Sequence, residues 1–380
     1  MMNSKKSKIK LNPEKSLEKK TAAHNVRNAF VAFFAAVFSL CLIVIMIVVY
    51  VDPFFHYHAP LENFPYVVDN QLSQNPGMAK NMTYDSCIIG SSMTVNFHTD
   101  DFESLLGLDT IKLSYSGALP HDDYNILSIV FDEDTLSRKT NDVKAVFVGV
   151  DAMTYTAGTD EIKYPLPEYL YDDNVFNDVS YVLNKDVLLE YILRPLVNKS
   201  PTNLSEVYES WWTPDYYNIN WVMHNYEPSE KIEEVMDKDA LIEGTKDNLE
   251  TNILPFIEAH PETTFYMFFP PYSILYWNDV INENHLDATM EQYSYLADTL
   301  LSYDNVRVFY FQNMSDVVTD LNNYADYTHY KPEINEYMVE CFADGEHEVT
   351  SSEQMDEELL EMRKIVENFD FDGLFLEYAG

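Results

Sequence analysis

Two hydroxyl residues follow a short apolar stretch early in the chain, and their position is suited to chemistry. The stretch from Cys87 to Ile89 is typical of a buried strand in a parallel sheet, and it ends at Gly90, Ser91 and Ser92. In open α/β sheets, ligands bind beyond the carboxyl ends of the strands, so a serine here would face the substrate crevice. We therefore interpret Ser92 as a candidate nucleophile, although Gly-Ser-Ser is also an ordinary turn with a helix cap.

A serine hydroxyl needs a base that takes its proton, and that base needs a carboxylate to orient it. Asp326 and His329 follow the last expected strand, and an Asp three residues before a His can hold the imidazole in the required tautomer. The same spacing recurs at Asp344 and His347, in an acidic run beyond the next helix. We prefer the first pair, because the end of the last strand should lie at the same sheet edge as Ser92.

The segments around these residues alternate between strand and helix patterns. Apolar runs predict strands at 87–89, 110–115, 144–151, 263–269 and 306–311. Helices are predicted at 99–107, 122–131, 229–260 (with breaks near Gly244 and Pro255), 284–302 and 332–342. This alternation is the signature of an α/β fold with a parallel, doubly wound central sheet.

The N-terminal region predicts a membrane anchor. Residues 29–51 contain no charged side chain and are long enough to span a bilayer. Residues 1–28 carry eight Lys and Arg but only two Glu, so the positive-inside rule places them in the cytoplasm. The apolar run lacks the small residues at which a signal peptide is cleaved. We therefore expect a single-pass anchor in the cell membrane, with everything after Val51 outside the cytoplasm.

The rest of the chain divides into a linker, one domain and a tail. Residues 52–83 show no clear period, and we expect a juxtamembrane linker there. Residues 84–345 are expected to form the α/β domain, with an aromatic-rich insertion over the crevice at 155–225. Residues 346–380 are strongly acidic, and Leu359, Met362, Val366 and Phe369 share one face of the helix expected there.

Composition limits the partners and cofactors. The chain has 24 Lys and Arg against 63 Asp and Glu, and the part after the apolar run is more acidic than the whole. Such a surface repels nucleic acid, anionic lipid headgroups and polyanionic polymers. The sequence lacks a glycine-rich phosphate loop, Cys-x-x-Cys and His-Glu-x-x-His, and we expect no cofactor and no metal site. His56 and His58 have a spacing that metals can use, but no third ligand is nearby. We expect Cys87 and Cys341 to be buried thiols.

Four sequence blocks resemble the SGNH/GDSL hydrolase superfamily, in its branch of membrane-anchored bacterial proteins related to alginate O-acetyltransferase-like and lipoteichoic acid D-alanylation-type proteins. The likeness covers roughly residues 84 to 342, and its strength is the order of the blocks. The blocks are Ile89-Gly90-Ser91-Ser92-Met93-Thr94, Leu113-Ser114-Tyr115-Ser116-Gly117-Ala118, Val148-Gly149-Val150-Asp151 and Asp326-Tyr327-Thr328-His329. The resemblance implies a flavodoxin-like three-layer fold.

The same resemblance implies roles for individual residues. Ser92 would be the nucleophile, His329 the base and Asp326 the carboxylate that orients it. The backbone N–H groups of Ser92 and Gly117 would bind the oxyanion, and the third block, which ends at Asp151, usually adds a donor.

Two positions depart from the family pattern. Ser91 stands where the superfamily usually has Asp, as is common in the membrane-anchored branch, and Asp151 stands where it usually has Asn. An ionised Asp would repel the negative charge that develops on the oxyanion, and losing one donor typically costs about 2.7–4 kcal/mol. Asp151 therefore points elsewhere, is protonated, or marks a weak or inactive site.

The expected reaction is acyl transfer through a serine acyl-enzyme, with water or a sugar hydroxyl as acceptor. The resemblance implies a cell-envelope polysaccharide as substrate, and a multi-span membrane O-acyltransferase is a candidate source of the acyl group. Aromatic side chains could stack on sugar rings or fill the core of the insertion. The candidate substrate contacts are Trp211, Trp212, Trp221 and Tyr272. The alternative is a catalytically inactive glycan-binding or scaffolding subunit, which Asp151 favours.

Overall fold

The computed structural model describes residues 13–132, 142–199, 201–209 and 213–378, with side chains from Thr21 onward. In the described part of the chain, the centre is a six-stranded sheet in the order β2-β1-β3-β4-β5-β6. The strands are β1 (Ser86–Ile89), β2 (Thr110–Lys112), β3 (Ala145–Gly149), β4 (Thr264–Phe269), β5 (Val306–Tyr310) and β6 (Glu348–Val349). The first five pair in parallel, and β6 pairs antiparallel to β5. The predicted mixed α/β class with a mostly parallel central sheet is therefore confirmed.

Two neighbouring strands, β1 and β3, are buried along their whole length, which explains the apolar runs in their sequences. Every residue of β1 and β3 is buried. All five predicted strands are present, although β2 and β3 end earlier than their apolar runs suggested. The antiparallel strand β6 was not predicted, because two residues are too few to show a period.

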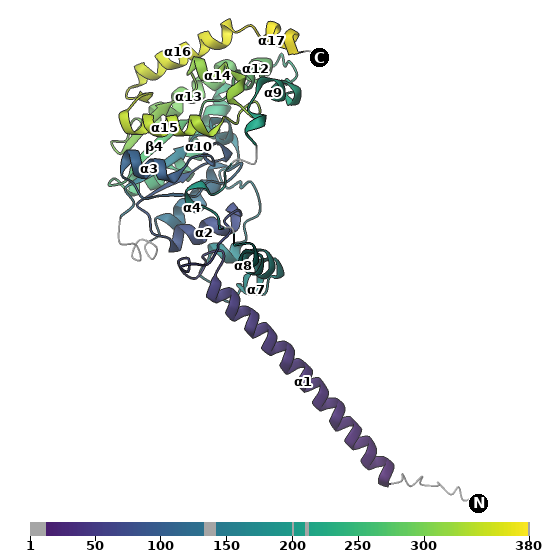
Figure 1. Ribbon diagram of the computed structural model, residues 1–380. Coiled ribbons are helices and arrows are strands. Elements are labelled where there is room, and N and C mark those ends of the chain that lie inside the picture. Colours follow the sequence, from purple (N-terminus) through teal and green to yellow (C-terminus); the bar gives the residue numbers. More distant parts are fainter. Residues whose placement is uncertain (1–12, 133–141, 200, 210–212, 379–380) are drawn as a thin grey trace, which may run out of the picture.

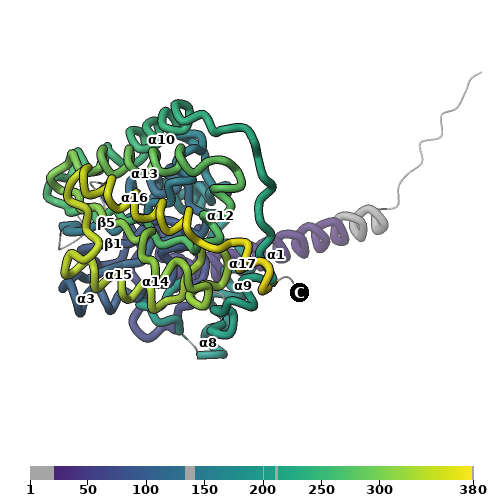
Figure 2. Tube along the Cα trace, turned by 90° about the horizontal axis from the view of Figure 1, so that it is seen from above, coloured from purple at the N-terminus to yellow at the C-terminus, as the bar shows by residue number. Residues whose placement is uncertain are grey.

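Helices lie on both sides of the sheet, and Figure 2 shows the strands between the two groups. One group packs α3 (Thr99–Leu106) against α15 (Pro332–Asp344). The other group is a connected set of five helices. They are α2 (Gln71–Asn81), α4 (Pro120–Val130), α10 (Lys238–Asn252), α13 (Leu286–Leu300) and α16 (Ser352–Asn368). The sheet therefore has helical layers on both faces.

One predicted helix differs from the structure, and another helix was not predicted. The helix expected at 229–260 begins only at Lys238, where Asp237 caps it, and it is broken at Ile253 before α11 (Leu254–Ala259). The break near Pro255 was anticipated, because proline interrupts the helical hydrogen bonds. Helix α12 (Ile274–Asn282) was not predicted, and it directly follows the Pro-Pro turn after β4.

The N-terminal helix α1 (Pro13–Val51) leaves the domain as one long rod (Figure 1). Within the described residues, the segment Thr21–Val51 is the one helix that is long and apolar enough to cross a membrane. Large apolar side chains such as Phe30, Phe34 and Phe38 point to solvent along it. These features agree with the expected anchor at 29–51, and its direction across the membrane stays a prediction.

The expected linker at 52–83 is wrong, because this segment is part of the domain. Its first residues, including Phe55, are buried in the core, and residues 71–81 form α2. The Gln74 side chain donates to the carbonyl oxygens of Pro53 (3.1 Å) and Val67 (2.9 Å). Side-chain hydrogen bonds of this kind hold irregular backbone in place without leaving a periodic pattern in the sequence.

The acidic tail at 346–380 also belongs to the domain. Strand β6 extends the central sheet, and α16 packs on α13. The predicted apolar face is confirmed at Leu359, Met362 and Val366, which are buried. After α16 the chain continues into α17 (Phe371–Tyr378), which contacts α9 (Ile219–Asn225).

The insertion at 155–225 is built of short helices that lie in two places. The early part lies beside the domain end of α1 (Figure 1), and α9 lies close to the 321–323 turn. The later part, α9, lies near the segment that follows β5, and Lys163 in the first part lies against Gly117 after β2. The early elements include α6 (Glu168–Tyr171), α7 (Val179–Val182), the π-helix η3 (Val187–Leu193) and α8 (Arg194–Asn198).

Candidate active site

A tight turn at the end of β1 presents Ser92. Gly90 has a φ of +122°, and a Cβ there would lie 3.1 Å from the carbonyl oxygen of Gly149, so only glycine fits comfortably. Ser91 then caps a single 3₁₀ turn, η1 (Ser92–Thr94). The strand, the glycine and the cap together place Ser92 at the carboxyl edge of the sheet.

A short hairpin after β5 presents His329. Tyr324 and Tyr330 bridge across it, and the Ala325 N–H donates to the His329 carbonyl oxygen at 2.9 Å. The Tyr330 hydroxyl donates to the carbonyl oxygen of Met93 at 2.8 Å, which ties the hairpin to the nucleophile turn. Two segments far apart in sequence are thereby held against each other.

The structure brings Ser92, His329 and Asp326 together in one chain of hydrogen bonds. Ser92 Oγ lies 2.7 Å from His329 Nε2, and His329 Nδ1 lies 2.7 Å from Asp326 Oδ2. The other carboxylate oxygen, Asp326 Oδ1, accepts from the backbone N–H groups of Thr328 and His329, both at 2.8 Å. Ser92 and His329 are half-buried, so a substrate can reach them. These are the distances and the order of groups that a serine nucleophile, its base and an orienting carboxylate require.

The surroundings keep Asp326 ionised. Burial favours its neutral form, but hydrogen bonds from the His329 side chain and from the Thr328 and His329 backbone outweigh this and lower the Asp326 pKa. An ionised Asp326 accepts a hydrogen bond from the N–H at His329 Nδ1. The lone pair of Nε2 can then accept the Ser92 hydroxyl proton.

The second Asp and His pair lies in a different environment. His347 Nε2 is 3.2 Å from the Tyr337 hydroxyl, and its carbonyl oxygen accepts from Tyr310 N–H at the edge of the sheet. Asp344 Oδ1 accepts from the backbone N–H of Glu346 at 2.9 Å. The structure thus brings the first pair, and not this one, to Ser92.

The backbone of Gly117 lies at the same sheet edge as Ser92. The Tyr115 N–H donates to the Gly90 carbonyl oxygen at 2.9 Å, and Ser92 and Gly117 each come two residues later. Gly117 has a φ of +78°, and the Lys163 side chain covers it, since a Cβ there would lie 3.0 Å from Lys163 Cε. The arrangement is compatible with two backbone donors beside the serine hydroxyl.

Asp151 binds neighbours of the candidate nucleophile. The Tyr272 hydroxyl donates to Asp151 Oδ1, and Ser91 also forms a hydrogen bond with the carboxyl group. Asp151 is 6 % exposed, and burial raises its pKa despite these bonds and the nearby His329.

Asp123 is a buried residue at the site that the sequence analysis missed. It accepts a hydrogen bond from the backbone N–H of Gly90, and burial together with Asp122 and Asp151 raises its pKa. Asp123 lies in the first turn of α4, beside the end of β1. The sequence does show two Asp residues at the start of a helix that follows a strand. The same pattern is common at the first turn of ordinary helices, so it did not mark Asp123 as a site residue.

The candidate aromatic contacts divide into three cases. Tyr272 is 2 % exposed, its ring packs in the core and its hydroxyl donates to Asp151, so its contact with a substrate stays a prediction. Trp221 is 36 % exposed and stacks on Tyr216, with ring centroids 4.3 Å apart. Trp211 and Trp212 lie outside the described residues.

A pocket opens beside the candidate carboxylate. It is lined by Asp326, Tyr327 and Asp279, together with residues around α9 that include Val222 and Tyr226. Asp279 accepts hydrogen bonds from the Tyr226 hydroxyl (2.6 Å) and the Ser229 backbone N–H (2.8 Å). The pocket therefore has both aromatic and carboxylate walls, which suit a polyhydroxylated ligand.

Among the described residues, no group of His, Cys, Asp and Glu has the arrangement of a metal site. Cys87 and Cys341 are buried and are not joined in a disulfide, as expected. A scan against protein-family models finds no match to this chain, and a search of curated proteins finds none either.

Proposed function

We propose that this chain is a membrane-anchored serine esterase or O-acyltransferase of the SGNH type. The observation that carries the proposal is the hydrogen-bonded series Ser92, His329 and Asp326, with both links at 2.7 Å. These residues come from opposite ends of the domain, and a purely structural role does not require this order of nucleophile, base and carboxylate.

The sheet topology supports the SGNH resemblance. The order of the five parallel strands is that of flavodoxin-like folds, in which ligands bind beyond the carboxyl ends of the strands. The first three sequence blocks follow β1, β2 and β3, and the fourth follows β5. All four therefore lie at the carboxyl edge of the sheet.

In the proposed reaction, Ser92 Oγ attacks an ester carbonyl while His329 Nε2 takes the hydroxyl proton. The carbonyl electrons move to oxygen, and the backbone N–H groups of Ser92 and Gly117 stabilise that charge. Collapse breaks the bond to the leaving alcohol, which receives the proton from His329, and leaves the acyl group on Ser92. Water or a sugar hydroxyl then repeats these steps as the acceptor.

The substrate proposed is a cell-envelope polysaccharide outside the cytoplasm. A tether of this kind holds the site near the bilayer, where such polymers are assembled and modified. Water as acceptor would make the protein an esterase, and a sugar hydroxyl would make it an O-acyltransferase, with a multi-span membrane O-acyltransferase as a candidate acyl supplier. The net charge of −39 disfavours a polyanionic polymer as the substrate.

Ester hydrolysis by the purified full chain tests the proposal. We expect Ser92→Ala to lower the release of p-nitrophenol from p-nitrophenyl acetate by at least about 10³-fold, because the covalent step is lost. Ser104→Ala, in the exposed part of α3, is the matched control and should leave the rate unchanged. Equal rates for Ser92→Ala and the unchanged chain would contradict hydrolysis.

A transferase that excludes water requires a second measurement. Cells carrying Ser92→Ala should show the same loss of polysaccharide acylation as cells that lack the gene, while the variant remains at its normal level in the membrane. Retained acylation, together with equal hydrolysis rates, would favour the alternative of an inactive glycan-binding or scaffolding subunit.

A further inference from the structure

Two neighbouring segments of the insertion expose an unusual number of large apolar side chains. Phe176 is 89 % exposed, and Val197 is 79 % exposed. We refer to the exposed apolar residues of both segments as the docking face. Its members are Val175, Phe176, Val179, Leu183, Leu189, Leu193, Leu196 and Val197.

The helical segment 187–198 is apolar on two sides. Val187 and Ile192 are buried in the core, whereas Leu189, Leu193 and Leu196 are exposed at a spacing that puts them on one face. A polar stripe that includes the Glu190–Arg194 ion pair lies on the same segment. A helix that is apolar on both sides is normally covered on both sides, because burying each such side chain stabilises by about 1.5–3 kcal/mol.

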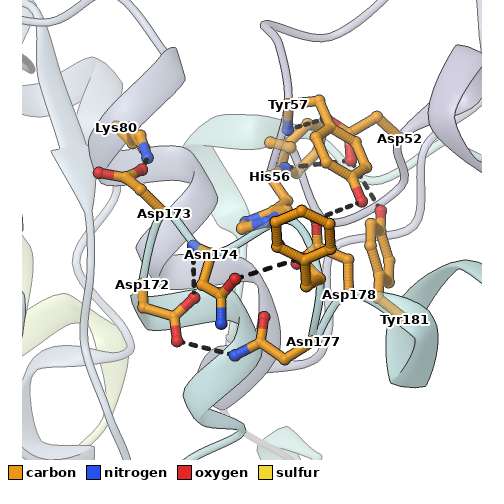
Figure 3. Close-up of polar contacts among 12 residues, drawn as sticks. Asp52, His56, Tyr57, Lys80, Asp172, Asp173, Asn174, Asn177, Asp178 and Tyr181 are labelled. Carbon is orange, nitrogen blue, oxygen red and sulfur yellow. Dashed lines mark hydrogen bonds and ion pairs between the residues drawn. The ribbon is translucent and has the colours of Figure 1, made fainter.

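The loop before α7 displays its apolar residues from a hydrogen-bonded turn. Asp172 accepts from the Asn174 backbone N–H (2.9 Å) and from the Asn177 side chain (2.8 Å). Asn174 Oδ1 in turn accepts from the Phe176 backbone N–H at 3.3 Å. Figure 3 shows these contacts. Val175 and Phe176 therefore project from an ordered turn.

The docking face lies beside the helix that can span a membrane. Helix α1 contacts both α7 and the π-helix η3, and α7 and α8 lie where α1 leaves the domain (Figure 1). Phe54, just past α1, stacks on Tyr181 of α7 at 5.3 Å and meets Tyr191 of η3 at 4.9 Å. The exposed apolar surface of α1 thus continues onto the insertion.

A buried carboxylate, Asp52, joins the end of α1 to α7 through hydrogen bonds (Figure 3). Asp52 is fully buried and accepts hydrogen bonds from the Tyr181 hydroxyl (2.7 Å) and the backbone N–H groups of His56, Tyr57 and His58. The Tyr57 hydroxyl donates to Asp178 at 2.8 Å. Helix α7 is therefore held at a fixed height relative to the end of α1.

The length of the apolar run sets that height. The 23 residues of 29–51 span about 34 Å as a helix, which exceeds the roughly 30 Å hydrocarbon core of a bilayer. The last turn of α1 therefore reaches the headgroup region. Val48 in this last part is fully buried by the domain, so the insertion meets α1 at the boundary between acyl chains and headgroups.

We propose that the docking face inserts into the outer leaflet of the bilayer and holds the domain against the membrane surface. The proposal rests on α1 spanning the membrane, as in the proposed function. The contact is apolar, because the acidic chain is not attracted by anionic headgroups. Binding should therefore not need anionic lipid, and it should persist as the salt concentration rises.

Lipid quenching in vesicles of phosphatidylcholine tests this docking in the full chain. An environment-sensitive fluorophore is attached to Phe176→Cys or Leu193→Cys, in a chain in which Cys41→Ala removes the accessible thiol. The control is Leu360→Cys, which is 51 % exposed on α16, far from α1 (Figure 1). We expect nitroxide-bearing lipid to quench the labels at 176 and 193 several-fold more than the label at 360, at low and high salt alike.

A label at Val37→Cys, within α1, reports whether α1 lies in the bilayer, independently of whether the docking face contacts lipid. Quenching at 37 but not at 176 or 193 would overturn the docking face and leave the anchor intact. No quenching at 37 would overturn both, because α1 would then not lie in the bilayer. The labels at 176 and 193 could instead be exposed to water in vesicles but protected from water in native membranes. That result would show that a membrane protein covers the docking face, and it would overturn lipid as the occupant.

Discussion

The Asp326 carboxylate orients the base through one oxygen and holds its own loop through the other. Asp326→Asn keeps the shape but can present an N–H to His329 Nδ1, which stabilises the wrong tautomer. We expect ester hydrolysis to fall by about 10³–10⁴-fold, with the chain still folded. Rates with p-nitrophenyl acetate and the circular dichroism spectrum of the variant check this expectation.

The matched control for this change is already in the sequence. Asp344→Asn alters the second Asp and His pair, whose His347 contacts Tyr337 and not Ser92. We expect its hydrolysis rate to equal that of the unchanged chain. A similar loss in both variants would mean that Asp326 acts through general stability and not through the base.

Asp151 gives a pH-dependent prediction. Burial raises its pKa in the folded state, so the folded chain binds this proton more tightly than the unfolded chain. The protonated carboxyl group therefore stabilises the folded state fully below the pKa of Asp in the unfolded chain, about 3.9. This stabilisation is lost as the pH rises through the pKa of Asp151 in the folded chain. Asn does not titrate, so the stability of Asp151→Asn relative to the unchanged chain should increase as the pH rises from 4 to 8. Urea unfolding from pH 4 to pH 8 measures this difference, and a constant difference across that range would contradict it.

At the scale of elements, Gly77 shows how closely α2 approaches the end of the anchor. A Cβ on Gly77 would lie 2.0 Å from the carbonyl oxygen of Phe54, and backbone cannot yield there as a side chain can. We expect Gly77→Ala to lower the free energy of unfolding by at least about 2 kcal/mol, which urea unfolding would detect.

Gly244 is the matched control for this substitution. It also lies within a helix, α10, but the nearest atoms to an added Cβ are at 3.9 Å. Gly244→Ala should therefore raise stability by about 0.5–1 kcal/mol, because alanine loses less chain entropy than glycine on folding. A similar loss for both variants would show that the close approach to the Phe54 carbonyl oxygen does not account for the cost of Gly77→Ala.

The sequence predicted the elements that carry a period and missed those held by individual contacts. Strand β3 and residues 87–89 of β1 are apolar because both faces are buried, so the positions of these strands can be predicted from the sequence. Segment 52–83 was predicted to be a linker, because its order comes from individual contacts: Gln74 donates to the Pro53 carbonyl oxygen, and Asp52 accepts from the Tyr181 hydroxyl. Contacts of that kind leave no pattern in a single sequence.

The same distinction applies to the candidate site. Strand ends share one edge in a parallel sheet, so topology alone favoured Asp326 and His329 over the later pair, and the structure brings them to Ser92. The partners of Asp151 could not be predicted, because Tyr272 meets it only through the fold. The burial of Asp123 was hidden for the same reason.

At the scale of the whole molecule, the anchor and the domain are one folded unit. The core extends into α1 through Val48 and Val51, and the Tyr66 hydroxyl donates to the Val51 carbonyl oxygen at 2.6 Å. An anchor joined by a flexible linker would let the site sample many heights above the membrane. The buried junction instead holds α1 rigidly on the domain, so an α1 that spans a membrane would keep Ser92 at one height above it.

This continuity predicts how the chain responds to removal of the anchor. A chain that begins at Leu42 keeps the last turns of α1, whereas one that begins at Asp52 loses the buried side chains of Val48 and Val51. Each such side chain stabilises by about 1.5–3 kcal/mol, so the shorter chain should be less stable by about 3–6 kcal/mol. Urea unfolding of both chains in the same mild detergent measures the difference. Equal midpoints would mean that the domain folds without its anchor, and the height of the site above the membrane would then be set by something other than this junction.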